Sequence, residues 1–209
     1  MDESYAVRFG VDYPDRDLNR LTTALRIFTA IPIAIVLGAI GGFDAQLGTG
    51  TTARTVAVGG AGLLFLPPLL LILFRQKYPR WWFDWNLQLM RFMNRVAVYV
   101  ALMDDSYPST DEEQAVHLDL TYPDAQHELN RWLPLVKWLL ALPHYVALFF
   151  LYIGAVIAVI GAWFAILITG RYPRGIFTFV EGVIRWHNRV VGYAFVLVTD
   201  RYPPFTLAP

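Results

Sequence analysis

The sequence predicts an all-α integral membrane protein made of two tandem helical-hairpin repeats with amphipathic interfacial helices, plus a small cytoplasmic β-sheet. Three observations lead to this fold class. The 209-residue chain is 56% hydrophobic, above the roughly 45–50% usual for soluble domains. Its longest apolar stretches reach the length of about 20 residues that a helix needs to cross a membrane. The sequence also repeats itself in order.

The repeat consists of short motifs that recur in the same sequence. Tyr78-Pro79-Arg80 returns as Tyr172-Pro173-Arg174, and segment 91–96 returns as 185–190, both at an offset of 94. Earlier matches have offsets of 109 and 111, and they pair Val7 with Val116, Asn19 with Asn130, Arg26 with Lys137, and Pro32 with Pro143. An ordered series of this kind is typical of duplicated units. We therefore predict repeat 1 over residues 1–106 and repeat 2 over residues 107–209.

Each predicted repeat opens with a strand, near 4–13 in the first and 114–122 in the second. Val7, Phe9 and Val11 alternate with more polar residues, which is the pattern of a half-buried strand. Strands from equivalent points of a duplication can pair. We expect them to form the small cytoplasmic sheet.

A helical hairpin follows each predicted strand. The first covers 26–74, and its two apolar arms are separated by a Gly- and Thr-rich loop. The second covers 133–170, where the apolar tract is unbroken. The segment between the matching motifs is 17 residues shorter there than in repeat 1. Gly154 or Gly161 would then form a very tight turn. One long kinked helix entered through Pro143 is the alternative.

An amphipathic helix closes each repeat, at 80–103 and 174–198. Its apolar surface carries a narrow polar stripe. Such a helix is too polar to span a membrane alone, and it suits the membrane interface. Candidate ligands for lipid phosphate or another anion are Arg91, Arg95, Arg185 and Arg189. The stripe partners are Asp84, Gln88, Glu181 and Asn188, and the interface anchors are Trp81, Trp82, Trp85, Tyr172 and Trp186. The stripes face either bulk headgroups or an enclosed cleft.

Charge predicts the orientation. If both hairpins enter from one side, Arg54 is the only Lys or Arg on the far side, and Asp44 is the only acid there. The positive-inside rule then places the polar mass in the cytoplasm. We predict a multi-pass protein of the bacterial inner membrane with both termini cytoplasmic and only the 44–55 loop and the 154–161 region near the other face.

Residues with catalytic chemistry are sparse. The chain has no Cys, and its four His lack the spacing of a metal site. We therefore predict a non-catalytic protein without metal or cofactor. A net charge of zero argues against nucleic acid as a partner. Three classes stay open: a scaffold or accessory subunit of a membrane complex, a lipid or small-molecule carrier with an arginine-lined cleft, and, weakest, a membrane-embedded enzyme. Expected partners are membrane lipids and either another membrane protein or a second copy of the chain.

Several motifs resemble a known family. They are Leu142-Pro143-His144-Tyr145, Gly170-Arg171-Tyr172-Pro173-Arg174-Gly175, Arg185-Trp186 and Thr199-Asp200-Arg201-Tyr202-Pro203-Pro204-Phe205. They resemble bacterial membrane proteins known only as a domain of unknown function, which occurs singly or in tandem. The resemblance covers nearly the whole chain and is strongest over 116–207. It implies a membrane location and no activity. Repeat 1 departs from the pattern, because Ile33 stands where repeat 2 has His144, so any chemical role of that histidine is missing from repeat 1.

Overall fold

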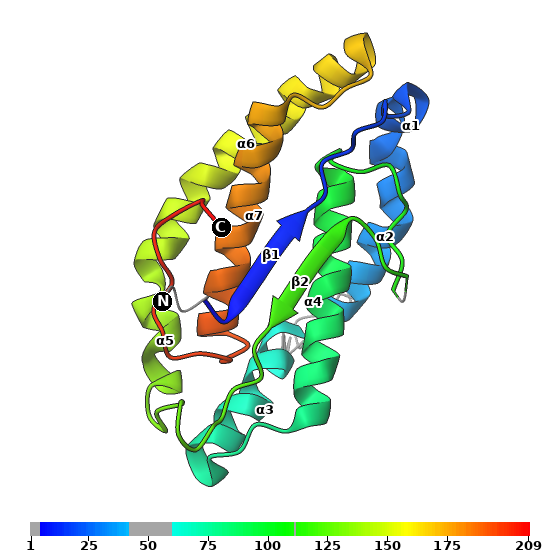
Figure 1. Cartoon of the computed structure of the whole chain (residues 1–209). Coiled ribbons are helices and arrows are strands. Elements are labelled where there is room, and N and C mark those ends of the chain that lie inside the picture. The colour runs from blue at the N-terminus through cyan, green and yellow to red at the C-terminus, as the bar shows by residue number, and fades with distance from the viewer. Residues whose placement is uncertain (1–4, 42–59, 111) are drawn as a thin grey trace, which may run out of the picture.

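The chain forms seven helices and one two-stranded sheet within residues 5–41, 60–110 and 112–209, the parts that the computed structural model describes (Figure 1). In chain order the elements are β1 (Val7–Val11), α1 (Arg20–Ala24), α2 (Arg26–Gly41), α3 (Gly60–Arg75), α4 (Arg80–Val100), β2 (Val116–Leu120), α5 (Pro134–Leu140), α6 (Leu142–Thr169) and α7 (Arg174–Ala194). The predicted loop at 44–55, with Asp44 and Arg54, lies outside the described residues.

The two strands pair in the antiparallel sense, and Phe9 of β1 lies opposite Leu118 of β2. Their burial follows the alternation in the sequence: Val7, Phe9 and Val11 are buried, and Val116 and Leu118 are buried opposite them. The other face of the sheet is polar. Its exposed side chains are Arg8, Asp12, His117 and Asp119.

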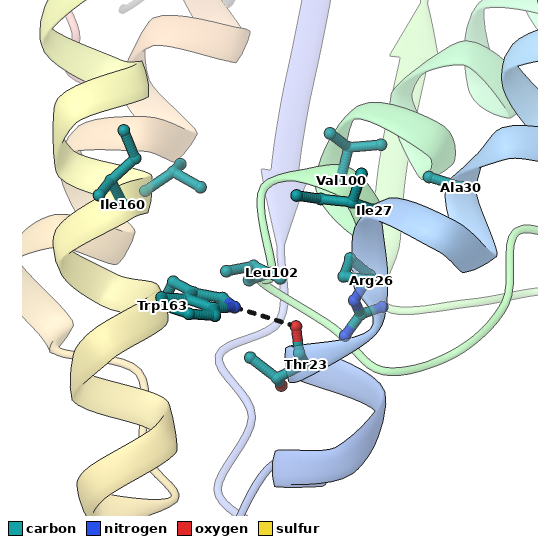
Figure 2. A pocket seen from close by; sticks show the side chains of 9 residues that line it. Thr23, Arg26, Ile27, Ala30, Val100, Leu102, Ile160 and Trp163 are labelled. Atoms are coloured by element: carbon teal, nitrogen blue, oxygen red, sulfur yellow. Dashed lines mark hydrogen bonds between the residues drawn. The ribbon is translucent and has the colours of Figure 1, made fainter.

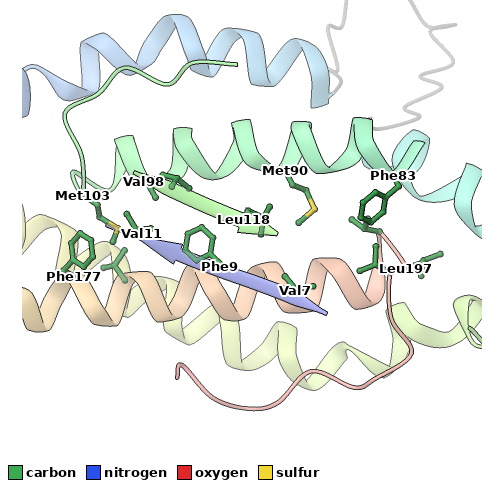
Figure 3. Packing of buried hydrophobic residues seen from close by; sticks show 14 of the residues in the cluster. Val7, Phe9, Val11, Phe83, Met90, Val98, Met103, Leu118, Phe177 and Leu197 are labelled. Atoms are coloured by element: carbon green, nitrogen blue, oxygen red, sulfur yellow. The ribbon is translucent and has the colours of Figure 1, made fainter. Parts of the chain in front are cut away.

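Helices α4 and α7 both pack against the sheet, α4 on β2 and α7 on β1. Each helix begins directly after a Tyr-Pro pair, with Pro79 and Pro173 as the extended N-cap residues. Proline disfavours helix in the residue before it, which places the boundary there. The buried side chains of the sheet meet those of both helices in one hydrophobic cluster, shown in Figure 3 with Met90, Phe177 and their neighbours.

The remaining helices flank this centre. In Figure 1, α6 lies beside α7 and α2 lies beside α4. Helix α6 runs antiparallel to α7 over most of its length, because His144 contacts Trp186 near one end and Gly161 lies close to Ile176 near the other. Helix α6 ends at Gly170, which has a φ of 77°, a left-handed conformation that glycine adopts at helix C-termini without steric cost. The last turn of α6 therefore passes into α7 through a short connection.

The predicted fold class is wrong. Residues 133–170 form no hairpin: after the short α5, α6 is a single helix of 28 residues. Gly154 and Gly161 lie inside it and face α7, where a Cβ on Gly154 would be 3.4 Å from the ring of Phe179. These glycines allow close helix packing, and no proline interrupts the helical hydrogen bonds between Pro143, at the start of α6, and Gly170.

Among the described residues, only α6 is long and apolar enough to cross a membrane. The structure is therefore not a multi-span protein of tandem hairpins. The carrier alternative, which required two matching hairpins around a central cleft, loses its main structural support.

Candidate functional site

The predicted arginine stripes face the sheet. Arg185 of α7 donates from Nε to the carbonyl oxygen of Phe9 at 2.9 Å, and Arg91 of α4 donates from Nε to that of Leu118 at 2.9 Å. Phe9 and Leu118 are the residues paired at the centre of the sheet. Each arginine thus ties the middle of one strand to one helix, an arrangement that the sequence did not indicate.

The two arginines differ in their acidic partners. Arg185 is buried, pairs with Glu181 and also donates to the carbonyl of Leu207 at 2.9 Å. Glu181 in turn accepts from the backbone N–H of Val11 at 3.3 Å. Arg91 is half-exposed and pairs with Asp119 at 3.0 Å on the open face of the sheet. Arg185 is therefore enclosed by protein, whereas Arg91 borders solvent.

Arg95 and Arg189 are also buried. Arg95 donates to the carbonyl of Ser109 at 2.7 Å, and Arg189 donates to that of Thr206 at 3.5 Å and lies 5.9 Å from the ring centre of Tyr5. All four guanidinium groups thus contact backbone carbonyls of the chain. Binding of lipid phosphate or another anion by them stays a prediction.

The other stripe residues separate into different environments. Asp84 pairs with Arg80 at the surface, and Gln88 is exposed. Asn188 is buried and exchanges two side-chain hydrogen bonds with Asn94, at 2.7 and 2.9 Å. This amide pair joins α7 to α4, and its two asparagines are 94 positions apart in the sequence. A cavity of about 290 Å³ lies beside it, but both amides are satisfied within the protein.

Some of the predicted interface anchors lie at the surface, and others lie in the core. Trp81 and Trp85 are exposed, by 68% and 47%, and Trp82 is half-buried. Tyr172 and Trp186 lie in the core instead. Burial raises the pKa of Tyr172, so its phenol stays protonated and donates to the carbonyl of Ala101 at 3.2 Å. Of these five predicted anchors, only the three tryptophans at the start of α4 are therefore accessible at the surface.

His144 lies at the base of α6 and is fully buried. Its Nδ1 accepts from Nε1 of Trp186 at 3.0 Å, and its ring stacks on Phe205 with the ring centres 4.0 Å apart. The motifs around it therefore meet in space, since the C-terminal segment folds back over α6 and α7. Its contacts make it a packing and hydrogen-bonding residue of this corner.

Two buried cations outside the stripes were not predicted as site residues from the sequence. Arg26 pairs with Asp105 at 2.7 Å, and Lys137 pairs with Asp200 at 2.7 Å. Burial lowers the pKa of Lys137, and the hydrogen bond and charge of Asp200 oppose that shift. The signal was available, because Arg26 and Lys137 occupy matching places in the repeat, and each half carries an aspartate just before a Tyr-Pro segment.

The outer surface of α6 is apolar and uncovered. Only 11% of its most apolar stretch of 18 residues is buried. Its exposed side chains include Val146, Phe149, Phe150, Ile153, Val156, Ile157, Phe164 and Ile168. Neighbouring helices add Ile27 and Phe28 of α2 and Leu139 of α5. Exposed apolar areas of this extent are typical of surfaces that contact a membrane or another protein.

Residues 132–206 match the family model of a domain of unknown function (DUF4389). The matched segment contains α5, α6, α7 and the C-terminal segment that covers His144. It supports a relationship to an uncharacterised family over the second half of the chain, where the sequence resemblance is strongest. No curated protein and no solved structure matches the chain. The family description carries no activity.

Proposed function

We propose that this protein is a non-catalytic, membrane-associated scaffold that lies on one side of a bilayer, with α6 parallel to the membrane plane. Its exposed apolar helices enter the interface, and the polar face of its sheet remains in water to contact a partner. The observation that carries this proposal is the uncovered apolar surface of α6, which packs through α7 onto a sheet with a charged, exposed face.

The length of α6 alone would permit a crossing. Its 28 residues extend about 42 Å at 1.5 Å per residue, which exceeds the hydrocarbon thickness of about 30 Å. However, α6 packs along α7, and α7 packs on β1. A transmembrane α6 would therefore carry α7 and the sheet into the bilayer beside it.

That placement is costly. The outer face of the sheet exposes Arg8, Asp12 and Asp119, and a charged side chain at the bilayer centre costs about 2.5–3.5 kcal/mol even on the most lenient scale. The pair of strands also has two open edges, which hydrocarbon does not tolerate. An in-plane orientation avoids both penalties because only the apolar helices contact lipid.

Membrane attachment can be tested by adding charge to α6. The double variant Phe150→Glu with Ile157→Glu changes two exposed side chains, so folding should persist while flotation with liposomes is lost. The matched control, Gln88→Glu with Gln126→Glu, adds the same charge at exposed sites away from α6 and should float like the unchanged protein. If the α6 variant floats normally, α6 is not the attachment surface.

The in-plane orientation has its own test, since the chain has no Cys. Gln126→Cys and Gly175→Cys place single thiols before α5 and after α6, at exposed positions. In sealed vesicles an impermeant thiol reagent should reach both or neither. Labelling of one thiol only would show that α6 crosses the bilayer, and it would refute this orientation.

We also propose that the chain is a tandem duplication whose halves form a pseudo-two-fold pair. Support comes from contacts that exchange partners between halves. Arg185 binds the first strand and Arg91 binds the second, while the hydroxyl of Tyr13 donates to the carbonyl of Tyr172 and that of Tyr122 to Tyr78. The Asn94 and Asn188 pair lies where such an axis would pass. A duplication of this kind gives two equivalent edges at which a scaffold can hold partners.

A further inference from the structure

A cavity of about 300 Å³ lies between α6 and α2, next to the contact of α1 with α6 (Figure 2). Its volume is at the lower end of the range for small-molecule sites. The walls are mostly apolar and come from Ile27, Val100, Leu102, Val159, Ile160 and Trp163. Figure 2 shows Trp163 and Ile160 of α6 across the space from Ile27 and Arg26 of α2.

Two buried polar side chains line this apolar space without their full set of hydrogen bonds. Arg26 is 3% exposed; its Nη2 bonds to Asp105, and its guanidinium lies 4.0 Å from the ring centre of Tyr99. Its Nε and Nη1 have no partner among the described residues, and neither does Oγ1 of the fully buried Thr23. Buried polar atoms are hydrogen-bonded in nearly all native proteins, so these three groups remain available to an acceptor that the described residues do not supply.

The corresponding cation in the other half differs. Lys137 is fully buried, and its Nζ reaches Asp200 at 2.7 Å and the carbonyl of Thr199 at 2.6 Å, with the ring centre of Tyr193 at 5.1 Å. The protein itself satisfies this lysine. The unused donors of Arg26 therefore distinguish it from the matching cation of the second half.

The charges around the cavity limit the ligand. Asp105 already neutralises Arg26, and no other charged residue lines the space. An acceptor without full negative charge therefore fits better than a phosphate or carboxylate. The apolar walls require a hydrocarbon body. Ile27 and Ile160 are exposed by 79% and 53% at the edge of the space, so a chain can enter from the apolar outer surface.

We propose that this cavity binds an acyl chain of a membrane lipid, with an ester carbonyl oxygen accepting hydrogen bonds from Arg26 and Thr23. The source of the ligand rests on the proposed membrane association, while the site itself rests on the cavity and its unsatisfied donors. The bound chain would lie beside the indole of Trp163, whose Nε1 donates to the carbonyl of Thr23 at 3.2 Å.

The experiment uses purified full-length protein in detergent micelles and phosphatidylcholine with brominated acyl chains. Bromine quenches nearby indoles, and the signal of Trp163 is obtained as the difference between the unchanged protein and Trp163→Phe. We expect saturable quenching of Trp163. Ala30→Phe, which fills the cavity, should abolish it, and Thr23→Val should weaken binding about fivefold through loss of one hydrogen-bonding group.

Two controls make the result decisive. Lys137→Met changes the satisfied cation of the other half and should leave quenching of Trp163 intact. A brominated free fatty acid in its carboxylate form should bind more weakly than the ester lipid, and tighter binding of the acid would overturn the ester assignment. Equal quenching in Ala30→Phe, or none in the unchanged protein, would overturn the site. Flotation is measured separately, so a failure of membrane attachment remains distinguishable from a failure of this cavity.

Discussion

Arg185 should contribute more to stability than Arg91, although both arginines bind the centre of a strand. The perturbation is Arg185→Met, which keeps an apolar side chain of similar length and removes every donor. It leaves Glu181 without its cation and removes the hydrogen bonds to the carbonyls of Phe9 and Leu207. Arg91→Met is the matched change and removes only the contacts to Leu118 and Asp119.

The magnitudes follow from burial. The side chains of Arg185 and Glu181 are 7% and 15% exposed, and breaking a buried ion pair costs about 3–5 kcal/mol. The side chains of Arg91 and Asp119 are 31% and 60% exposed; such a pair contributes about 0–1 kcal/mol, and the hydrogen bond to Leu118 adds about 1 kcal/mol. We therefore expect Arg185→Met to be more destabilising than Arg91→Met by about 1–4 kcal/mol, with about 2 kcal/mol as a representative value.

Urea unfolding in mild detergent, followed by circular dichroism, measures this difference. For a chain of this length, about 2 kcal/mol corresponds to roughly 4–8 °C in melting temperature. The double variant Glu181→Gln with Arg185→Met should recover part of the loss, because the unpaired buried carboxylate is removed. Equal destabilisation by Arg185→Met and Arg91→Met would refute the reasoning from burial.

Two further predictions concern contacts between elements. Asn94→Leu should cost about 1–3 kcal/mol because it leaves the buried amide of Asn188 without its partner, whereas the double change to Leu should cost less than the sum of the single changes when both are measured by urea unfolding. Gly192→Ala should destabilise the protein, because the added Cβ would lie 2.6 Å from Cγ2 of Val7. Gly175→Ala, which meets nothing within 4 Å, should be neutral or stabilising by up to about 1 kcal/mol. Thermal melts that rank these two glycine variants in the opposite order would contradict the observed packing of α7 on β1.

Residues close in sequence determined the elements that were predicted correctly. Alternation of apolar and polar side chains sets the faces of β1 and β2, because successive side chains of a strand point to opposite sides. The Tyr-Pro pairs set the starts of α4 and α7, because proline restricts the residue before it. Both rules act within a few residues, so the sequence alone was sufficient.

The course of residues 133–170 depended on tertiary packing. An apolar tract satisfies its backbone as one long helix or as two short ones, and its glycines suit either a turn or a close helix contact. Packing of Gly154 against Phe179 selects the single helix. The matching motifs predicted a hairpin, but such matches do not require the same helix break when the segment between them is 17 residues shorter.

In the candidate sites, too, the sequence determined the local pattern and the tertiary structure determined the partners. The 3.6-residue period placed the arginines of α4 and α7 on one stripe of each helix, yet their partners are carbonyls of strands, such as that of Phe9, 176 positions from Arg185. The Arg26 cavity likewise forms only where α1, α2 and α6 meet. A hydrogen bond or a cavity depends on which distant segments become neighbours, and that is settled by the burial of the whole core. The sequence alone therefore determined which local elements form and which faces are apolar, whereas only the tertiary structure decided where the charged groups point.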